Sequence, residues 1–226
     1  MVTGKFLKKM NPDILIHPLT GLYYYFIAAL DIHGNYSPVA VTQAPSTSLD
    51  LTMFIEGFYD AGSNMQVSDS VSVELRNSIS PYAIAGQTKG VVTSEGMVRL
   101  YFGNIASGNY YITVSHRNSI STWSANSILI ISGGLNSYDL STANTQAYGN
   151  NLTRVDLSPV RFAIYSGDEN QNGIVDLSDV VNVSNAAGSF TTGYVPTDMN
   201  GDGVVDLSDM VITSNNASAF ISKIVP

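Results

Sequence analysis

The apolar and polar positions along the chain predict short strands over most of its length and helices only near its end. Val71, Val73 and Leu75 alternate with polar side chains, as a strand with one exposed face requires. Clusters of Gly, Asn, Ser and Pro separate such segments. Strands are predicted at 51–58, 70–76, 90–93, 97–102, 110–116, 127–131 and 160–165. The pattern is typical of an antiparallel β-sandwich over residues 46–163.

Residues 1–45 show a different pattern, in which apolar side chains occupy both alternating sets of positions from Tyr23 to Leu30. This predicts a strand buried on both faces, followed by a polar turn and a second strand. The turn residues are Asp31, Gly34, Asn35 and Pro38. The stretch resembles the last hairpin of a fibronectin type III domain; the alternative is an unrelated hairpin that packs on the next domain. Because two strands alone are marginal in water, we expect a longer modular protein upstream.

The lysines before this apolar run invite comparison with a signal peptide. Pro12, Asp13 and Pro18 interrupt the stretch where a continuous apolar region is needed, and residues 21–30 are too short to cross a membrane. We therefore interpret the run as a strand and expect any export signal to lie outside this sequence. Residues 43–49 form a short linker rich in Pro, Ser and Thr.

Charge is concentrated at the C-terminus. Residues 164–226 hold eight of the 18 acidic side chains but one of the ten basic ones, in a chain of net charge -8. Such a chain is poorly suited to nucleic acid, because few cations are available to replace the counterions of phosphates. The sequence has no cysteine, which excludes disulfide scaffolds and Cys-based zinc sites. An acidic tail of this kind suits a bound cation.

The acidic tail is an internal duplication. Residues 168–187 and 198–217 are identical at twelve of twenty positions, with an offset of 30 residues. Each copy begins with an Asp/Asn-rich loop that has Gly at its sixth position, at Gly173 and Gly203. A hard divalent cation such as calcium takes six to eight oxygen ligands, and a twelve-residue loop supplies them from positions 1, 3, 5, 7, 9 and 12.

These positions define two candidate calcium sites. The predicted ligands of the first are Asp168, Asn170, Asn172, the carbonyl of Ile174, Asp176 and Asp179. Those of the second are Asp198, Asn200, Asp202, the carbonyl of Val204, Asp206 and Asp209. Val175 and Val205 follow the seventh position, and we expect them to point inward and pair across the two loops.

The segments beside the loops distinguish the tail from an EF-hand, which has a helix on both sides of its loop. Residues 161–167 alternate like a strand and Pro196 lies just before the second loop, so neither loop has an entering helix. Helices are predicted only after the loops, at about 177–187 and 207–220. A duplicated loop with an exiting helix resembles the dockerin family over residues 167–222. The predicted fold is therefore mainly β with a small α C-terminal module over 164–226.

The resemblance implies a function as well as a fold. Dockerins bind two calcium ions and attach their parent protein to a cohesin domain, often in polysaccharide-degrading complexes on bacterial cell surfaces. Carried over to this chain, the family pattern implies a secreted, non-catalytic module whose partner surface includes Leu177, Ser178, Leu207 and Ser208. Many dockerins carry basic residues further along these helices, where this chain has Ser184, Asn185, Ser214 and Asn215.

Other interpretations of the sequence remain open. The calcium module could stabilise only its own chain, and the sandwich could bind carbohydrate through Trp123, Tyr110 and Tyr111, although core packing is the ordinary role of aromatic strand residues. Glu56 and Asp60 could form a glycosidase pair, but we expect solvated carboxylates. His17, His33 and His116 lack the spacing of a metal site and are predicted to lie at the surface.

Removal of calcium should unfold the C-terminal module and spare the sandwich. If each site has a Kd of about 10 μM, 1 mM calcium adds about 2.7 kcal/mol of stability per site, which is large for a unit with few apolar residues. We expect EDTA to reduce the helical circular dichroism signal while the β signal persists. An unchanged helical signal would contradict the prediction.

Overall fold

The computed structural model describes residues 24–27, 40–43 and 47–226, and the chain forms two compact units, Met1–Ala44 and Pro45–Pro226. In the first unit, β1 (Tyr24–Ile27) and β2 (Ala40–Gln43) pair antiparallel. The predicted turn between them, Asp31, Gly34, Asn35 and Pro38, lies outside the described residues, as do His17 and His33. The relation to a fibronectin type III domain stays a prediction.

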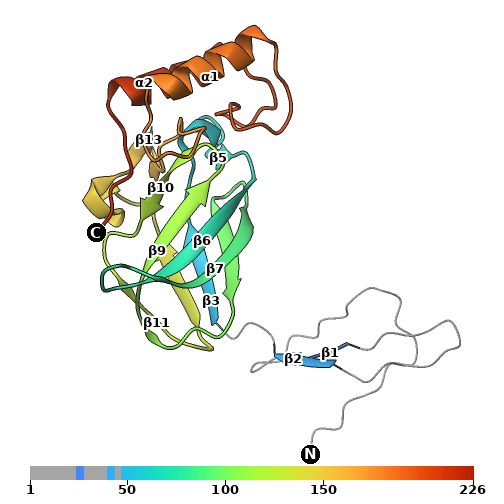
Figure 1. Cartoon of the computed structure of the whole chain (residues 1–226), viewed down its shortest axis with the longest axis vertical. Coiled ribbons are helices and arrows are strands. Elements are labelled where there is room, and N and C mark those ends of the chain that lie inside the picture. The colour runs from blue at the N-terminus through green and yellow to red at the C-terminus, as the bar shows by residue number, and fades with distance from the viewer. Residues whose placement is uncertain (1–23, 28–39, 44–46) are drawn as a thin grey trace, which may run out of the picture. The chain divides into compact units, whose positions relative to one another are not determined.

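The second unit is mainly β, with two helices near its C-terminus (Figure 1). Its larger sheet has the strand order β10-β9-β6-β7, and β11 pairs with the start of β9. These strands are β6 (Asp69–Asn77), β7 (Ile84–Val92), β9 (Gly108–His116), β10 (Ser119–Trp123) and β11 (Ile128–Ile130). All pairs in this sheet are antiparallel.

The smaller sheet has the order β12-β3-β8, built from β3 (Thr47–Thr52), β8 (Met97–Phe102) and β12 (Leu135–Asp139). Strands β3 and β8 are antiparallel, but β12 runs parallel to β3, so the fully antiparallel sandwich that we predicted is wrong at this edge. The chain enters β12 at the same end of the sheet at which β3 begins. The N–H of Ser48 donates to the carbonyl of Gly134 at 3.1 Å, so both strands start at the same end of the sheet.

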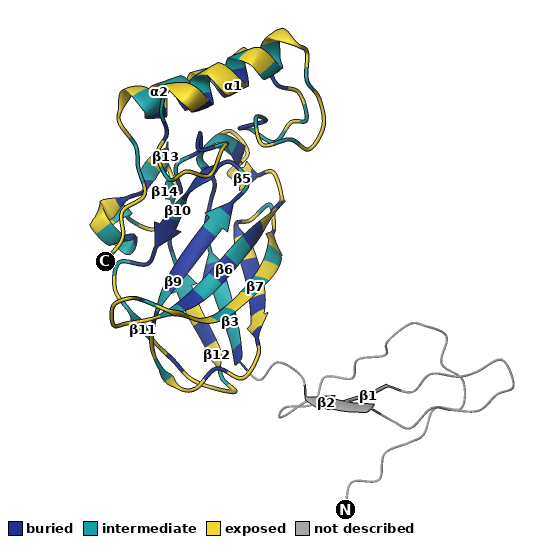
Figure 2. Ribbon diagram, viewed as in Figure 1, coloured by how far each residue is buried: buried dark blue, intermediate teal, exposed yellow. Residues whose placement is uncertain are grey.

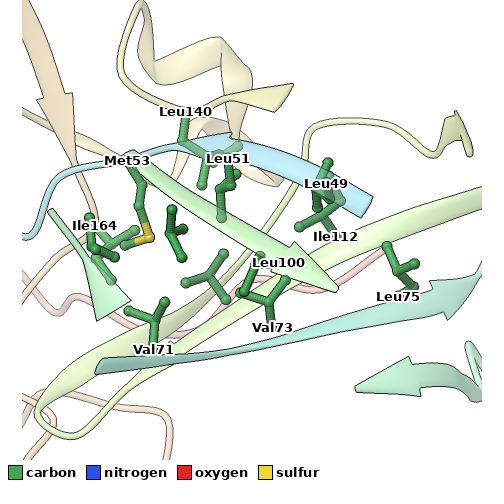
Figure 3. Close-up of a cluster of buried hydrophobic side chains, with 14 of the residues drawn as sticks. Leu49, Leu51, Met53, Val71, Val73, Leu75, Leu100, Ile112, Leu140 and Ile164 are labelled. Atoms are coloured by element: carbon green, nitrogen blue, oxygen red, sulfur yellow. The ribbon is translucent and has the colours of Figure 1, made fainter. Parts of the chain in front are cut away.

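The core lies between the two sheets. Strands β3, β6 and β8 bury every second side chain, because successive side chains of a strand point to opposite faces. Figure 3 shows Leu49, Leu51 and Met53 facing Val71 and Val73 across this core. Alternation in the sequence therefore predicts both the strands and their buried faces.

Short elements close the ends of the sandwich. They are β4 (Tyr59–Asp60) with β5 (Met65–Gln66), β13 (Thr153–Leu157) with β14 (Val160–Ala163), and the 3-10 turns η1 (Glu56–Phe58), η2 (Asn144–Gln146) and η3 (Tyr148–Asn150). The predicted strand 51–58 ends at Thr52 and passes into η1. Strand β3 begins inside the predicted linker 43–49, and β10, β12 and β13 were not predicted.

The two helices are α1 (Leu177–Gly188) and α2 (Leu207–Ser218), close to the predicted ranges. Each begins with a capping box: the side chain of Asp176 accepts from backbone N–H groups of the first turn, and Asp179 accepts from the N–H of Asp176. Asp206 and Asp209 repeat this arrangement. The same Asp-x-x-Asp spacing that suggests calcium ligands therefore also starts the helices.

The helices lie at one end of the sandwich with one face exposed (Figure 2). They contact each other, and Val183, Met199 and Val205 form a small core beneath them. The predicted boundary between residues 163 and 164 falls inside the single compact unit Pro45–Pro226. No helix among the described residues is long and apolar enough to cross a membrane.

Candidate metal centre and its contact with the sandwich

Each acidic loop is folded by hydrogen bonds from its own backbone to its own side chains. In the first loop, Asn170 Oδ1 accepts from the N–H of Asn172, and Asn172 Oδ1 accepts from the N–H of Ile174, both at 2.9 Å. Asn200 and Asp202 make the same two bonds in the second loop at 2.9 and 2.8 Å. The duplication therefore extends from sequence to local geometry, because such short side chains stabilise turns two residues ahead.

The first and twelfth positions of each loop are brought together. Asp179 accepts from the backbone N–H that follows Asp168 at 3.2 Å, and Asp209 accepts from the N–H that follows Asp198 at 2.6 Å. All four side chains are at most 2% exposed. Buried carboxylates are rare unless cations or strong hydrogen-bond donors compensate them.

The first loop holds a carboxylate oxygen without a partner. Asp168 Oδ1 is buried and accepts no hydrogen bond, while its Oδ2 accepts from the N–H of Gly173 at 3.1 Å. Burial, with the negative charge of Asp179, raises the pKa of Asp168 to about 6. Burial also raises the pKa of Asp209. In both cases, the burial of the carboxyl group disfavours its charged form.

The sixth position of each loop needs a left-handed backbone. Gly173 and Gly203 have φ of 89° and 83°, a region that side chains with a Cβ rarely adopt. After this turn, the carboxylates at the ninth position, Asp176 and Asp206, face the helix start. Hydrogen bonds from Ser178 and Ser208 hold the pKa of each below its usual value.

The donor set fits a hard cation in its chemistry. All predicted ligands are oxygens, as calcium prefers, and the unpartnered Asp168 Oδ1 gives the first loop a free buried donor. Within the described residues, no three His, Cys, Asp or Glu side chains converge as a metal cluster. Asparagine oxygens and backbone carbonyls make up the rest of the predicted set, and the carboxylates at the ninth position point to the helix amides. Calcium binding stays a prediction here.

The two valines after the seventh position are buried, as expected, and their backbone N–H groups bond to segments outside both loops. The N–H of Val175 donates to the carbonyl of Ile221 at 2.8 Å, and the N–H of Val205 donates to that of Thr191 at 2.9 Å. Each loop is therefore bonded to the segment that follows the other repeat's helix. This exchange joins the two repeats into one module.

The predicted partner residues lie at the exposed start of each helix. Leu177 and Leu207 are 72% and 69% exposed. Ser178 and Ser208 are also exposed, but their hydroxyls donate to Asp176 and Asp206 at 2.6 and 2.7 Å. The serines therefore belong to the hydrogen-bond network of the loops, whereas the leucines are free to contact a partner.

The second loop is held against the sandwich by residues that the sequence analysis did not single out. Asn118 Nδ2 donates to the carbonyl of Asp198 at 2.6 Å. Arg117 Nη1 contacts the carbonyl of Val195, and its Nη2 lies 3.5 Å from Asp198 Oδ2. Both residues sit in the turn between β9 and β10. In the sequence, the sign of this contact was a basic residue in a polar turn.

Asp69 anchors Arg117 from the sandwich side. It accepts from Arg117 Nε at 3.0 Å and from the Tyr194 hydroxyl at 2.7 Å, and its Oδ2 lies 3.2 Å from His116 Nε2. Burial acts to raise the pKa of Asp69, but these donors outweigh it and hold the pKa well below its usual range. His116 is 3% exposed, so its predicted surface placement is wrong.

A second contact joins the sandwich to α2 through Glu56, which we expected to be solvated. Its carboxylate accepts from Asn216 Nδ2 at 2.5 Å and from the N–H of Ser166 at 3.1 Å. Burial raises its pKa, although both hydrogen bonds act in the opposite direction. Asp60 is exposed and bonds within its own turn, so the two carboxylates do not share a cleft.

The aromatic side chains weighed as sugar contacts are mostly packed. Trp123 and Tyr110 are 6% and 9% exposed, and Tyr111 packs edge to face on Trp123 with centroids 5.8 Å apart. Burial leaves little of the Trp123 and Tyr110 rings accessible to a sugar, whereas Tyr111 is half-buried. Trp123 and Tyr110 therefore pack in the core, which is the ordinary role of aromatic side chains in strands.

No protein-family model and no curated protein sequence matches the chain. Among solved structures, it is similar to chains from two crystal structures of a type II cohesin–X-dockerin complex from Acetivibrio cellulolyticus, one an N-terminal and the other a C-terminal interface mutant. The sequence identities are 16% and 17%. Each match has a TM-score of 0.44 and covers 77% of this chain and 99% of the matched chain. At that TM-score, the likeness supports no conclusion about family or function.

The half-buried Glu56 should make stability depend on pH in a defined direction. Because its pKa is raised on folding, its carboxyl group costs nothing below the unfolded pKa of about 4.3, and the penalty grows as pH rises through the folded pKa. We expect the wild type to lose stability relative to Glu56→Gln between pH 4 and pH 7, as measured by urea unfolding at constant calcium.

Glu95→Gln is the matched control, because Glu95 is exposed and its pKa is lowered, chiefly by a hydrogen bond from its own backbone. Its stability difference from the wild type should change with pH in the opposite direction. A pH-independent difference between the wild type and Glu56→Gln would show that the half-buried carboxylate carries no charge penalty.

Proposed function

We propose that the C-terminal module binds two calcium ions and presents its helix pair to a cohesin-type partner protein, as a non-catalytic attachment module. The observation that carries the calcium part is the buried Asp168 Oδ1, which no donor satisfies although Asp179 lies beside it. A divalent cation would bind the oxygen that has no hydrogen-bond partner, and it would offset the negative charges of the two neighbouring carboxylates.

The residues that would hold each ion are the loop oxygens already predicted. Asp168 and Asp179 would supply carboxylate oxygens to the first ion, and Asp198 and Asp209 to the second. Bound calcium supplies positive charge at the centre of each loop. The chain's own residues determine the geometry of each site. The glycines allow the turn, hydrogen bonds from backbone N–H groups to Asn and Asp side chains shape the loop, and the capping boxes start the helices.

The partner surface is supported by a duplicated set of exposed apolar side chains. Each repeat exposes an aliphatic residue in its loop, two on its helix and a phenylalanine after the helix. The pairs and their exposed fractions are Ile174 and Val204 (49% and 47%), Leu177 and Leu207 (72% and 69%), Val181 and Val211 (47% and 48%), and Phe190 and Phe220 (87% and 87%). Exposed apolar groups mark protein-interaction surfaces where they gather into a patch, and their duplication supports this role for the helix pair.

A test of the partner compares capture of the full chain by immobilised type I and type II cohesins in calcium and in EDTA. We expect capture in calcium only, and we expect Leu177→Asp with Leu207→Asp to weaken it by about tenfold or more, because charge would enter a desolvated apolar contact. Leu157→Asp is the matched control, since Leu157 is equally exposed, at 70%, on a strand of the sandwich.

Four outcomes would contradict the proposal. Capture that is equal in EDTA would separate the partner from calcium, and equal capture of the double variant would exclude the helix pair. If the chain binds an immobilised dockerin instead, the sandwich rather than the tail is the receptor. If calcium raises stability and no cohesin binds, the module stabilises only its own chain.

A further inference from the structure

The two loops repeat each other in sequence but differ in the charge beside them. At the first position of the second loop, Asp198 Oδ2 lies 3.5 Å from the guanidinium of Arg117. The equivalent carboxylate of the first loop, Asp168, pairs with no cation among the described residues, and its Oδ1 has no partner. Lys223 lies beside Gly173 of the first loop, but among the described residues no ion pair joins it to a carboxylate of that loop.

Arg117 is held rigidly where it touches the second loop. Its Nε donates to Asp69 at 3.0 Å, and its guanidinium carbon lies 4.5 Å from the ring centroid of Tyr194 and 5.4 Å from that of Phe58. Its side chain is 12% exposed. A cation fixed by this many contacts loses little entropy when it pairs, and burial reduces the screening of its charge by solvent.

The two carboxylates also differ in their hydrogen bonds. Both oxygens of Asp198 have partners: Oδ1 accepts from the N–H of Gly201 at 2.8 Å, and Oδ2 accepts from Gly203 at 3.2 Å and faces Arg117. Asp168 lacks a partner on Oδ1. When no calcium is bound, the second loop therefore has a compensating positive charge and full hydrogen bonding at its first position, and the first loop has neither.

We propose that Arg117 is a built-in counter-cation that keeps the second loop folded without calcium. Loss of calcium then loosens the first loop, while the second stays attached to the sandwich. Although both repeats carry ligands, the loss of helix in EDTA that the sequence predicts then falls mainly on the first repeat. The part that concerns the first loop rests on the proposed calcium binding; the part that concerns Arg117 and Asp198 does not.

This arrangement has a consequence for the partner surface. Leu207 and Val211 follow the second loop and would keep their position in the absence of calcium, whereas Leu177 and Val181 would not. Calcium would therefore control half of a duplicated apolar surface. A partner that needs both halves would bind only when the first loop is filled.

Hydrogen exchange of the full chain, followed by mass spectrometry, tests this. In EDTA, we expect amides of residues 168–179 to exchange about tenfold or more faster than those of 198–209. Arg117→Gln removes the charge but keeps a polar side chain, and should bring 198–209 to the rate of the first loop. Arg99→Gln is the matched control, since Arg99 pairs with Asp50 on the outer face of the smaller sheet. Exchange in β6 and β9 reports whether each variant is folded.

The results separate the two proposals. Equal exchange of the two loops in wild-type EDTA samples, or an Arg117→Gln variant with folded sheets and a still-protected second loop, would overturn the role of Arg117. If calcium protects neither loop but Arg117→Gln loosens the second, calcium binding fails and the role of Arg117 stands. Arg117→Lys, which keeps the charge, should keep the second loop protected even if Arg117→Gln does not fold.

Discussion

The structure of the C-terminal module depends on burying paired carboxylates. Asp168 with Asp179, and Asp198 with Asp209, are withdrawn from solvent at the centre of two turns, and the first and last positions of each turn lie side by side. Burial, together with the negative charge of the neighbouring carboxylate, raises the pKa of Asp168 in the first pair and of Asp209 in the second. The helices start at these same carboxylates. The stability of both helices therefore depends on positive charge close to the loop carboxylates.

The chain supplies part of that charge itself. Arg117 reaches from the β9–β10 turn to the second loop, and Asp69, Tyr194 and Asn118 complete the contact. Glu56 and Asn216 form a second contact between the sandwich and α2. The module is thus packed on the sandwich within one compact unit, although the sequence suggested two successive domains. On α2, Asn216 contacts the sandwich, whereas Leu207 and Val211 are exposed.

Local features of this fold could be predicted because they depend on neighbours in the sequence. The alternation from Met97 to Phe102 matches β8 residue for residue, and the ends of the two Asp/Asn-rich loops placed both helix starts. Gly173 and Gly203, which the sequence places at the sixth position of each loop, have positive φ. In each case, a turn or a strand period determines the geometry within a few residues.

Features set by distant contacts could not be predicted in this way. Strand β12 is parallel to β3, with Ser48 bonded to Gly134 86 residues away, and the buried His116 lies 3.2 Å from Asp69. Glu56 accepts a hydrogen bond from Asn216, which is 160 residues away. The contact of Asn216 corresponds to a difference between the two repeats of the sequence. Asn216 stands where the first repeat has Ala186, so departures from an internal repeat can mark residues that serve a contact made by one copy only.

Calorimetric titration of the full chain with calcium tests the central claim most directly. The account requires two binding events, and it requires Asp168→Asn with Asp179→Asn to abolish one while leaving the other. It also requires that removing the second pair, Asp198 and Asp209, has the reciprocal effect. Absence of heat from the wild-type chain over the micromolar to millimolar range, confirmed by equilibrium dialysis, would contradict the account.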